Sequence, residues 1–371
     1  MARAPAVQEL EAPPEADRLE GFPHPRETGV LFGHADAERT LAGAVASGRM
    51  HHGWIFAGPA GIGKATLAYR LACHLLAAPA ERDGAGGGRA IAAKTSAARQ
   101  VKALAHPGLL VLRRQWDPKA KRLGTQIAVD EVRRLRSFLS LTAATASWRV
   151  VIVDPADELN VSAANAVLKS LEEPPPQTVF MLISAKPGRL LATIRSRCRV
   201  LALAPLGPKD LRRAADQAIA AAGRDAIDDA SWPRIAHLAD GSVRRALALA
   251  GNDGLVLADK VEAILALLPK VDWIAAHALA DDLAAAQAGD RCEAFLALLL
   301  RALAERVRAR AAGTGPLAAE ARRLIPDGRL AEFAETWQAI VDEAAEADRL
   351  NLDRKALILN TLSRLAAAGG G

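Results

Sequence analysis

The chain has 371 residues, of which 51% are hydrophobic and 24% charged, with a formal net charge of +6. It is long enough for two or three globular domains, and its basic balance permits contact with nucleic acid. Aromatic residues make up only 4%, which argues against a base-stacking surface. The three cysteines are too widely spaced for a disulfide framework or a metal knuckle and suit a reducing cytoplasm. No signal peptide and no membrane-spanning apolar run is present in the sequence.

The first segment, residues 1–24, is rich in proline, alanine and glutamate and lacks apolar periodicity. We expect it to be disordered, because it has too little apolar surface to bury. Its acidity argues against a mitochondrial-type transit peptide. A helical pattern then extends over residues 28–49, with Gly33 and His34 in the loop before the helix.

A short apolar strand, a glycine-rich turn and an apolar helix follow, which is the order that a phosphate-binding P-loop requires. The strand covers residues 55–57, and Gly58, Gly61 and Gly63 allow the backbone to aim its N–H groups inward. The helix presents its positive N-terminal end at the same point. Lys64 is expected to reach the outer phosphates as a point charge. These residues predict a P-loop fold.

One position departs from the P-loop pattern G-x-x-x-x-G-K-[ST]. The hydroxyl that should follow the lysine and bind Mg²⁺ is replaced by Ala65. Thr66 does not simply replace it, because one residue along a helix turns the side chain by about 100°. We retain Thr66 among the candidate residues of a degenerate nucleotide site.

Residues 78–103 contain several glycines and are expected to form a flexible insertion, whose simplest interpretation is a solvated loop. Strands are predicted at residues 109–112 and, as a short edge, at residues 127–129. Asp130 is then the expected N-cap of an amphipathic helix.

A continuous apolar run over residues 148–154 ends in a carboxylate, as expected for a buried strand of a parallel sheet. Asp154 is placed to hold the shell of Mg²⁺. The carboxylate that orients the attacking water often follows directly, but Pro155 stands there. Asp157 and Glu158 lie further along, where facing solvent or capping the next helix is the expected role for both.

The pattern continues with a helix at residues 161–171, a buried strand at 178–184, a short helix at 190–194 and a last strand at 200–203. Strands that alternate with helices predict an α/β fold with a parallel sheet. Three short helices follow at residues 209–222, 232–239 and 243–251, and long Ala/Leu/Arg-rich helices run to the end, interrupted near residues 313–316 and 326. We therefore predict an α/β domain at residues 25–205, a helical lid at 206–253 and an all-helical domain at 254–371.

Two further positions are candidates for phosphate contact. Ser184 ends a strand, where its side chain is placed to sense a γ-phosphate, although local structure is the simpler role for a lone serine. Arg244 begins a lid helix and is placed to reach back to phosphate, whereas its neighbour Arg245 is expected to be solvated.

Arg195, Arg197 and Arg199 form a dense basic set before the last strand. Its simplest interpretation is a solvated turn. The alternative is that Arg197, within the run Ser-Arg-Cys, is an arginine finger offered in trans to the γ-phosphate of a neighbouring subunit.

At this point the chain resembles the clamp-loader group of AAA+ proteins over roughly residues 28–250. The resemblance rests on residues 58–66, 150–157, 162–175 and 193–198 and on the lid motif at Gly241, with a weaker signal at residues 351–360. It implies a P-loop AAA+ domain, a small helical lid and an all-α C-terminal collar for oligomerisation.

The resemblance further implies a role in DNA replication, in a bacterial replisome at the nucleoid. Gamma/tau and delta clamp-loader subunits are the implied partners, the sliding clamp is an indirect one, and primed DNA is contacted through its phosphates. Such a subunit is a non-hydrolysing stator of the polymerase holoenzyme, and Arg197 would be its finger toward a gamma/tau site. No cofactor is required, and weak binding of ATP or ADP stays open.

Many members of this group carry a four-cysteine zinc module after the P-loop helix. No cysteine lies between Cys73 and Cys198 here, so we expect no zinc and no metal site. The alternative function is a catalytically active AAA+ ATPase that acts on DNA or protein. Ala65 and Pro155 argue against it, because two independent parts of the hydrolytic machinery are missing.

Overall fold

The computed structural model describes residues 14–78, 81, 95–119, 122–140, 148–251, 253–285, 289–350 and 352–369. By compactness the chain divides into two units, Met1–Ala226 with Asp240–Arg244, and Ile227–Ala239 with Arg245–Gly371. This division does not test the three predicted domain boundaries, which stay a prediction. No helix in the described ranges is long and apolar enough to cross a membrane.

The first unit is built on a five-stranded parallel sheet of strand order β2-β5-β6-β1-β7. Its strands are β1 (Gly53–Ala57), β2 (Leu109–Leu112), β5 (Arg149–Val153), β6 (Thr178–Ser184) and β7 (Arg199–Ala202). All residues of β1 and β6 are buried, because helices cover both faces of the sheet. The predicted parallel α/β sheet is therefore confirmed. Strand β1 lies between β6 and the edge strand β7.

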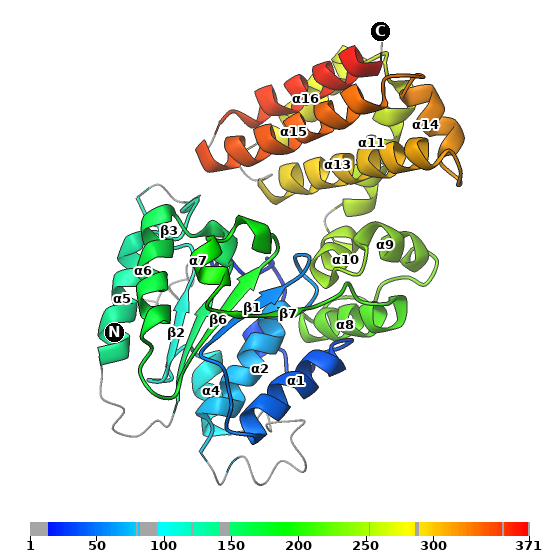
Figure 1. Cartoon of the computed structure of the whole chain (residues 1–371). Coiled ribbons are helices and arrows are strands. Elements are labelled where there is room, and N and C mark those ends of the chain that lie inside the picture. The colour runs from blue at the N-terminus through cyan, green and yellow to red at the C-terminus, as the bar shows by residue number, and fades with distance from the viewer. Residues whose placement is uncertain are drawn as a thin grey trace, which may run out of the picture. The chain divides into compact units, whose positions relative to one another are not determined.

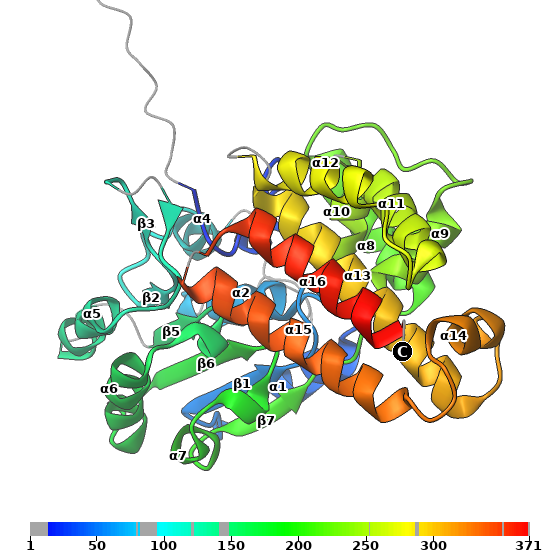
Figure 2. The ribbon, with the colours of Figure 1, turned by 90° about the horizontal axis from the view of Figure 1, so that it is seen from above.

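Two helical layers cover the sheet (Figures 1 and 2). One face packs against α1 (Ala35–Ala46), α2 (Lys64–Leu76) and α4 (Ser96–Lys102). The other packs against α5 (Val129–Ser140), α6 (Val161–Glu172) and α7 (Ala192–Arg195). Side chains of β1 alternate between the two layers, Phe56 facing the first and Ile55 the second, as the period of two in a strand requires.

The remaining elements of this unit are short, apart from α8 (Pro208–Ala221). There are 3₁₀ turns η1 (Pro25–Glu27), η2 (Ala156–Glu158) and η3 (Pro187–Arg189). The strands β3 (Trp116–Asp117) and β4 (Arg122–Leu123) pair antiparallel, and neither was among the strands predicted from the sequence.

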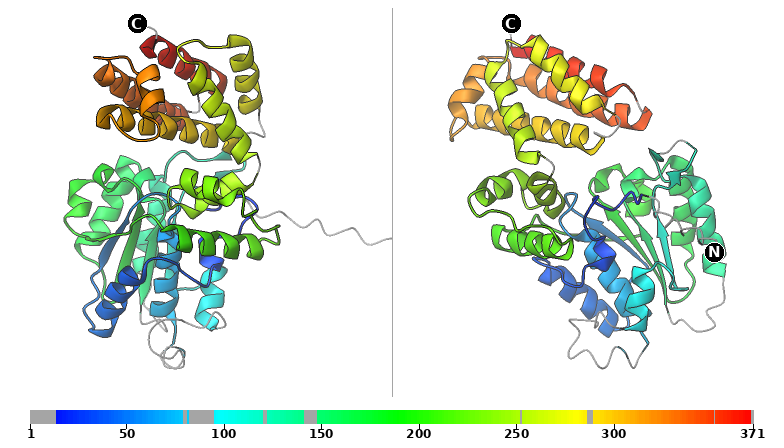
Figure 3. Two further views of the ribbon diagram at one scale, coloured as in Figure 1. Left: turned by 90° about the vertical axis from the view of Figure 1, so that its right-hand side faces the viewer. Right: turned by 180° about the vertical axis from the view of Figure 1, so that it is seen from behind.

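The second unit is helical, with α9 (Trp232–Ala239), most of α10 (Val243–Ala250), α11 (Gly254–Leu267), α12 (Trp273–Ala284), α13 (Gly289–Ala312), α14 (Ala318–Leu324), α15 (Leu330–Leu350) and α16 (Arg354–Gly369). The helices α11–α16 share one apolar core that includes the fully buried Phe295, Phe333 and Ile340. Figure 3 shows the long helices of this unit running beside one another. The predicted breaks near residues 313–316 and 326 are confirmed.

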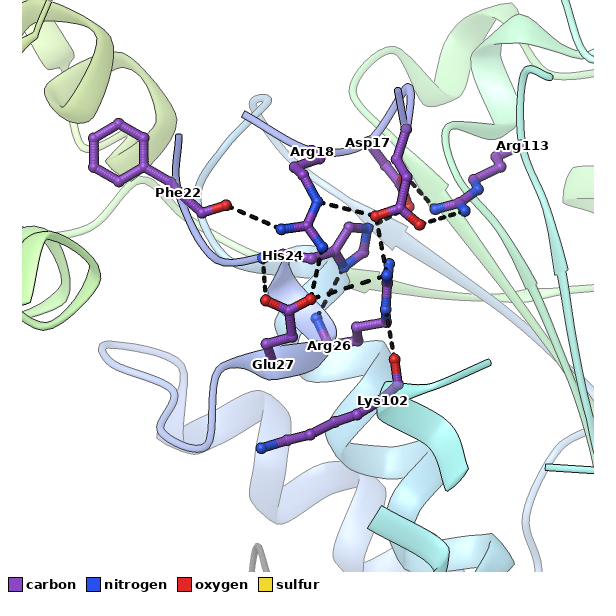
Figure 4. A network of polar contacts seen from close by, with 9 residues as sticks. Asp17, Arg18, Phe22, His24, Arg26, Glu27, Lys102 and Arg113 are labelled. Atoms are coloured by element: carbon purple, nitrogen blue, oxygen red, sulfur yellow. Dashed lines mark hydrogen bonds and ion pairs between the residues drawn. The ribbon is translucent and has the colours of Figure 1, made fainter. Parts of the chain in front are cut away.

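Residues 14–27 correct the predicted N-terminal disorder, although residues 1–13 lie outside the described residues. We call residues 14–27 the strap. It is held by ion pairs with distant elements (Figure 4): Arg113, just after β2, binds Asp17 at 2.7 Å and Glu15 at 2.6 Å. Asp17 also lies 2.8 Å from Nε2 of the buried His24. Arg26 donates to the Lys102 carbonyl at 2.8 Å. Charge pairing therefore ties the strap to distant elements, and the strap buries Phe22 as well.

Three further predictions were wrong in detail. Most of the insertion 78–103 lies outside the described residues, but its last part forms α4, capped by Thr95, and packs Val101 into the core. The expected strand edge at residues 127–129 is a single bridge from Ile127 to Leu159. Helix α5 already begins at Val129, so Asp130 lies in its first turn and is not the N-cap.

Candidate nucleotide site and arginine turn

The turn from β1 into α2 has the conformation of a P-loop. Gly58, Gly61 and Gly63 have φ values of 148°, 76° and 107°. A Cβ at Gly58 would lie 2.3 Å from the Leu203 carbonyl oxygen, and one at Gly61 would lie 2.5 Å from the Ser242 hydroxyl oxygen. Only glycine fits these two positions. A side chain would strain the backbone at these φ values and would collide with atoms of residues 203 and 242.

Lys64 begins α2 and is 5% exposed. Its ammonium group donates hydrogen bonds to the carbonyls of Gly58, at 2.7 Å, and Pro59, at 2.5 Å. Burial lowers the pKa of Lys64, while the negative charges of Asp154 and Asp157 oppose that change. The ammonium group is thus inside the turn. There it is placed to bind an anionic phosphate in place of the two backbone carbonyls that it now contacts.

Asp154 follows β5 and is buried beside the same turn. Burial raises the pKa of its carboxyl to about 7, the strap carboxylate Asp17 raises it further, and Lys64 opposes the rise. A carboxyl group with such a pKa is partly protonated at neutral pH, and a protonated carboxyl is a poor ligand for Mg²⁺.

The position after Lys64 offers no ligand for Mg²⁺. The methyl group of Ala65 packs against the apolar core on the α2 side of the sheet. Thr66 is half-buried one residue further along α2, about 100° around the helix axis. The residues therefore fit the phosphates of a nucleotide but not the coordination shell of a metal ion.

Asp157 does not cap α6 or face solvent, which corrects the prediction. Its carboxylate accepts hydrogen bonds from the Ser184 hydroxyl at 2.6 Å and from the Ala185 backbone N–H at 2.6 Å. The cap of α6 is Asn160, which accepts from Ala163 N–H at 2.8 Å. Asp157 thus fixes the end of β6, and the hydroxyl of the buried Ser184 is engaged in local structure rather than aimed at phosphate.

Glu158 was predicted to face solvent or to cap a helix, and it does neither. It forms an ion pair with Arg114 at 2.7 Å, where both side chains are about one quarter exposed (30% and 21%). Both carboxylates after Pro155 are therefore bound to other parts of the unit.

The run from Gly241 to Arg244 lies against the P-loop, as the lid motif predicted. Ser242 donates to the Ala60 carbonyl at 2.9 Å, and Val243 N–H donates to the Gly61 carbonyl at 2.9 Å. Arg244 is exposed, and its charge lowers the pKa of Asp154, so it acts on the site electrostatically. The structure brings Arg244 together with the predicted glycines, Lys64 and Asp154.

Sequence reasoning missed the role of His34. Its ring is 6% exposed, and Nε2 lies 2.6 Å from the Ile62 carbonyl oxygen inside the P-loop. The signal available was the pair Gly33-His34 in the loop before α1. A polar side chain that reaches across 28 residues is not visible in local patterns.

Arg197 is the one predicted site residue that the structure does not place with the others. It precedes β7, whose Arg199 is in register with Trp54 near the start of β1, whereas Gly58 follows the end of β1. Six residue steps at ~3.3 Å each put Arg197 roughly 20 Å from Gly58 along the strand direction. Arg197 therefore lies near the amino-terminal ends of β1 and β7, whereas the P-loop follows the carboxyl end of β1.

The turn that carries Arg197 is rigidly packed. A Cβ on Gly53 would lie 2.8 Å from the Cys198 sulfur and 3.2 Å from the Arg197 carbonyl oxygen, so the turn sits directly on the start of β1. Burial raises the pKa of the Cys198 thiol to about 11, which keeps the sulfur protonated and unreactive. The guanidinium of Arg197 contacts Glu172, at the end of α6, at 2.9 Å.

No group of three or more His, Cys, Asp or Glu residues able to hold a metal ion occurs within the described ranges. The absence of zinc stays a prediction.

Comparison with known proteins matches residues 33–207 to the family described as DNA polymerase III, delta subunit. The delta-prime subunit of Pseudomonas aeruginosa DNA polymerase III is 43% identical over 147 residues, which are 40% of this chain and 41% of the relative. The delta-prime subunit of Escherichia coli is 35% identical over 170 residues, 46% of this chain and 47% of the relative.

The tau subunit of Bacillus subtilis DNA polymerase III is 27% identical over 237 residues, 61% of this chain and 37% of the relative. The matches thus span less than half the length of these relatives. The matched region holds the P-loop, the strand that precedes Asp154 and the Ser-Arg-Cys turn, so residues 33–207 are similar to delta-prime subunits of DNA polymerase III over these parts of the candidate site.

Proposed function

We propose that the chain is a non-hydrolysing stator subunit of a DNA polymerase III clamp loader, which offers Arg197 to the ATP site of a gamma/tau neighbour. In this role it helps ATP-driven loading of the sliding clamp on primed DNA. The observation that carries the proposal is the separation of two half-sites: the P-loop lacks the hydroxyl ligand after Lys64, and the turn that carries Arg197 lies at the opposite end of the strands.

The P-loop half supports weak nucleotide binding without hydrolysis. Lys64, the turn N–H groups and Arg244 supply positive charge for phosphates. Ala65 supplies no hydroxyl for Mg²⁺, Pro155 supplies no base, and Asp157 is bound to the end of β6. A water-orienting carboxylate and a metal are both needed for in-line attack on phosphate.

The arginine half supports action in trans. Arg197 is roughly 20 Å from its own Gly58 along the strands, which is further than an arginine side chain extends. Arg197 stands on a packed turn and its side chain is 37% exposed, so it is available to another protein. A planar, permanently charged donor is suited to the γ-phosphate in the transition state.

The partners follow from the relatives. Proteins named as delta-prime and tau subunits of DNA polymerase III match this chain. Gamma/tau and delta subunits are therefore the proposed direct partners, with the clamp and primed DNA reached through the assembled loader.

Reconstitution with gamma/tau and delta tests this function. Arg197→Ala should leave the chain folded and able to join the complex, while DNA- and clamp-stimulated ATPase falls and clamp loading slows. Removal of an arginine finger lowers the rate of ATP hydrolysis on the order of 10³-fold at the site that the finger serves. The loss in total ATPase of the loader is smaller, because the other gamma/tau sites keep their fingers. Arg195→Ala and Arg199→Ala are matched controls, because both residues are exposed and flank the turn, at the end of α7 and the start of β7.

Two results would contradict the proposal. A mutant loader that assembles and loads clamps at the normal rate would exclude the finger. ATP turnover by the purified chain that Lys64→Ala abolishes would instead identify an active AAA+ ATPase.

A further inference from the structure

The guanidinium of Arg197 is held by two partners within its own chain. Its Nη2 lies 2.9 Å from a carboxylate oxygen of Glu172, and its Nη1 donates to the Thr193 carbonyl at 3.0 Å. The Ser196 hydroxyl lies 3.5 Å from Nη1. These contacts come from the end of α6 and from α7, so two separate elements determine the orientation of one planar group.

Both partners suit a cation for physical reasons. Glu172 is the last residue of α6, and Thr193 lies in the short helix α7, just before Arg197. Helix C-termini carry partial negative charge, which attracts a guanidinium. An arginine has five N–H donors, and the contacts above use at most three. At least two donors therefore remain for a phosphate while Glu172 is still bound.

We propose that Glu172 is a positioning residue for the arginine finger: it orients the Arg197 guanidinium so that its remaining donors meet the neighbour's γ-phosphate. The inference rests on the proposed function of Arg197 and adds a residue that acts through it. Because the donors that bind Glu172 differ from those left over, the carboxylate and the phosphate do not compete for the same N–H groups.

The size of the effect follows from the exposure of the pair. The Arg197 and Glu172 side chains are 37% and 44% exposed, so solvent screens their attraction. Exposed pairs of this kind contribute about 0.2–1 kcal/mol, which corresponds to up to about a fivefold change in rate. Glu172→Gln should therefore remove up to about four-fifths of the stimulated ATPase that Arg197→Ala removes.

The experiment uses the full chain in the reconstituted loader and measures stimulated ATPase at varied ATP concentration. Glu172→Gln should lower kcat and leave KM nearly unchanged, because a finger acts mainly in the transition state. The matched control is Glu173→Gln, since Glu173 is the adjacent exposed glutamate, and it should behave as the wild type. In the Arg197→Ala background, Glu172→Gln should cause no further loss.

The outcomes separate the two proposals. If Arg197→Ala has no effect, the finger and its positioning residue are both excluded. If Arg197→Ala lowers the rate but Glu172→Gln matches the Glu173 control, the finger stands and the positioning role is excluded. A faster Glu172→Gln loader would show that the carboxylate restrains the finger instead, and a further loss in the Arg197→Ala background would show that Glu172 acts elsewhere; either result overturns the inference.

Discussion

The strap should make a large contribution to the stability of the first unit, and Asp17→Ala tests it. The Asp17 side chain is 3% exposed and pairs with Arg113 at 2.7 Å and with His24 at 2.8 Å. Removal of the Asp17 carboxylate leaves Nε2 of the fully buried His24 without this partner (Figure 4). It also removes one of the two carboxylates that neutralise Arg113, the other being Glu15. The strap then keeps only the Glu15 ion pair with Arg113, just after β2.

Breaking a buried ion pair by removing one partner costs about 3–5 kcal/mol. Glu15 stays 2.6 Å from Arg113 and limits the uncompensated charge. We therefore expect a loss at the lower end, about 3 kcal/mol in the free energy of unfolding. For a unit of this size that corresponds to a decrease in Tm of about 6–12 °C.

Urea denaturation followed by circular dichroism measures the loss, and hydrogen exchange of α2 peptides assigns it to the first unit. The control is Asp216→Ala, because Asp216 pairs with Arg212 at 2.9 Å but is 44% exposed. That change should cost no more than about 0.5 kcal/mol. Equal losses for the two variants, or rapid exchange of residues 14–27 in the wild type, would refute the reasoning.

Four further predictions follow from the site. The pKa of Asp154 in the folded state, about 7, exceeds its ordinary value of 3.8, so the folded protein binds more protons in that window and loses stability as pH rises through it. Asp154→Asn should flatten this loss and raise Tm at pH 8, as a pH series of thermal melts would reveal; an unchanged series would contradict it. Gly61→Ala should lower Tm by several degrees, because its Cβ would lie 2.5 Å from the Ser242 hydroxyl oxygen; an unchanged Tm would argue against the close packing. Metal analysis of the native protein should find no stoichiometric zinc, and a ratio near one per chain would mean that a site was missed. Binding to DNA should show no sequence preference and should weaken steeply with salt in a fluorescence titration, because phosphate contacts release counterions; salt-independent binding would count against it.

The sequence by itself determined the sheet and the P-loop. Unbroken apolar runs predicted β2 and β6 with their observed bounds, and β1 and β5 within two residues. Such runs can be recognised in the sequence because strands covered on both faces need apolar side chains at every position. The P-loop turn could also be predicted from its glycines, because their backbone conformations and close contacts exclude a side chain.

Only the tertiary structure decided the strap and the roles of the charged residues. The strap residues Glu15 and Asp17 bind Arg113, which is 98 and 96 residues away, so no local pattern could indicate that this segment has a defined structure. Asp157 likewise binds Ser184 across 27 residues instead of capping the helix beside it. A charged side chain leaves no periodic signature, because its role depends on which partner the fold places beside it. The same holds for Arg197: its residue type suggested a finger, but only the parallel register of β1 and β7 placed it at the end of these strands opposite its own P-loop.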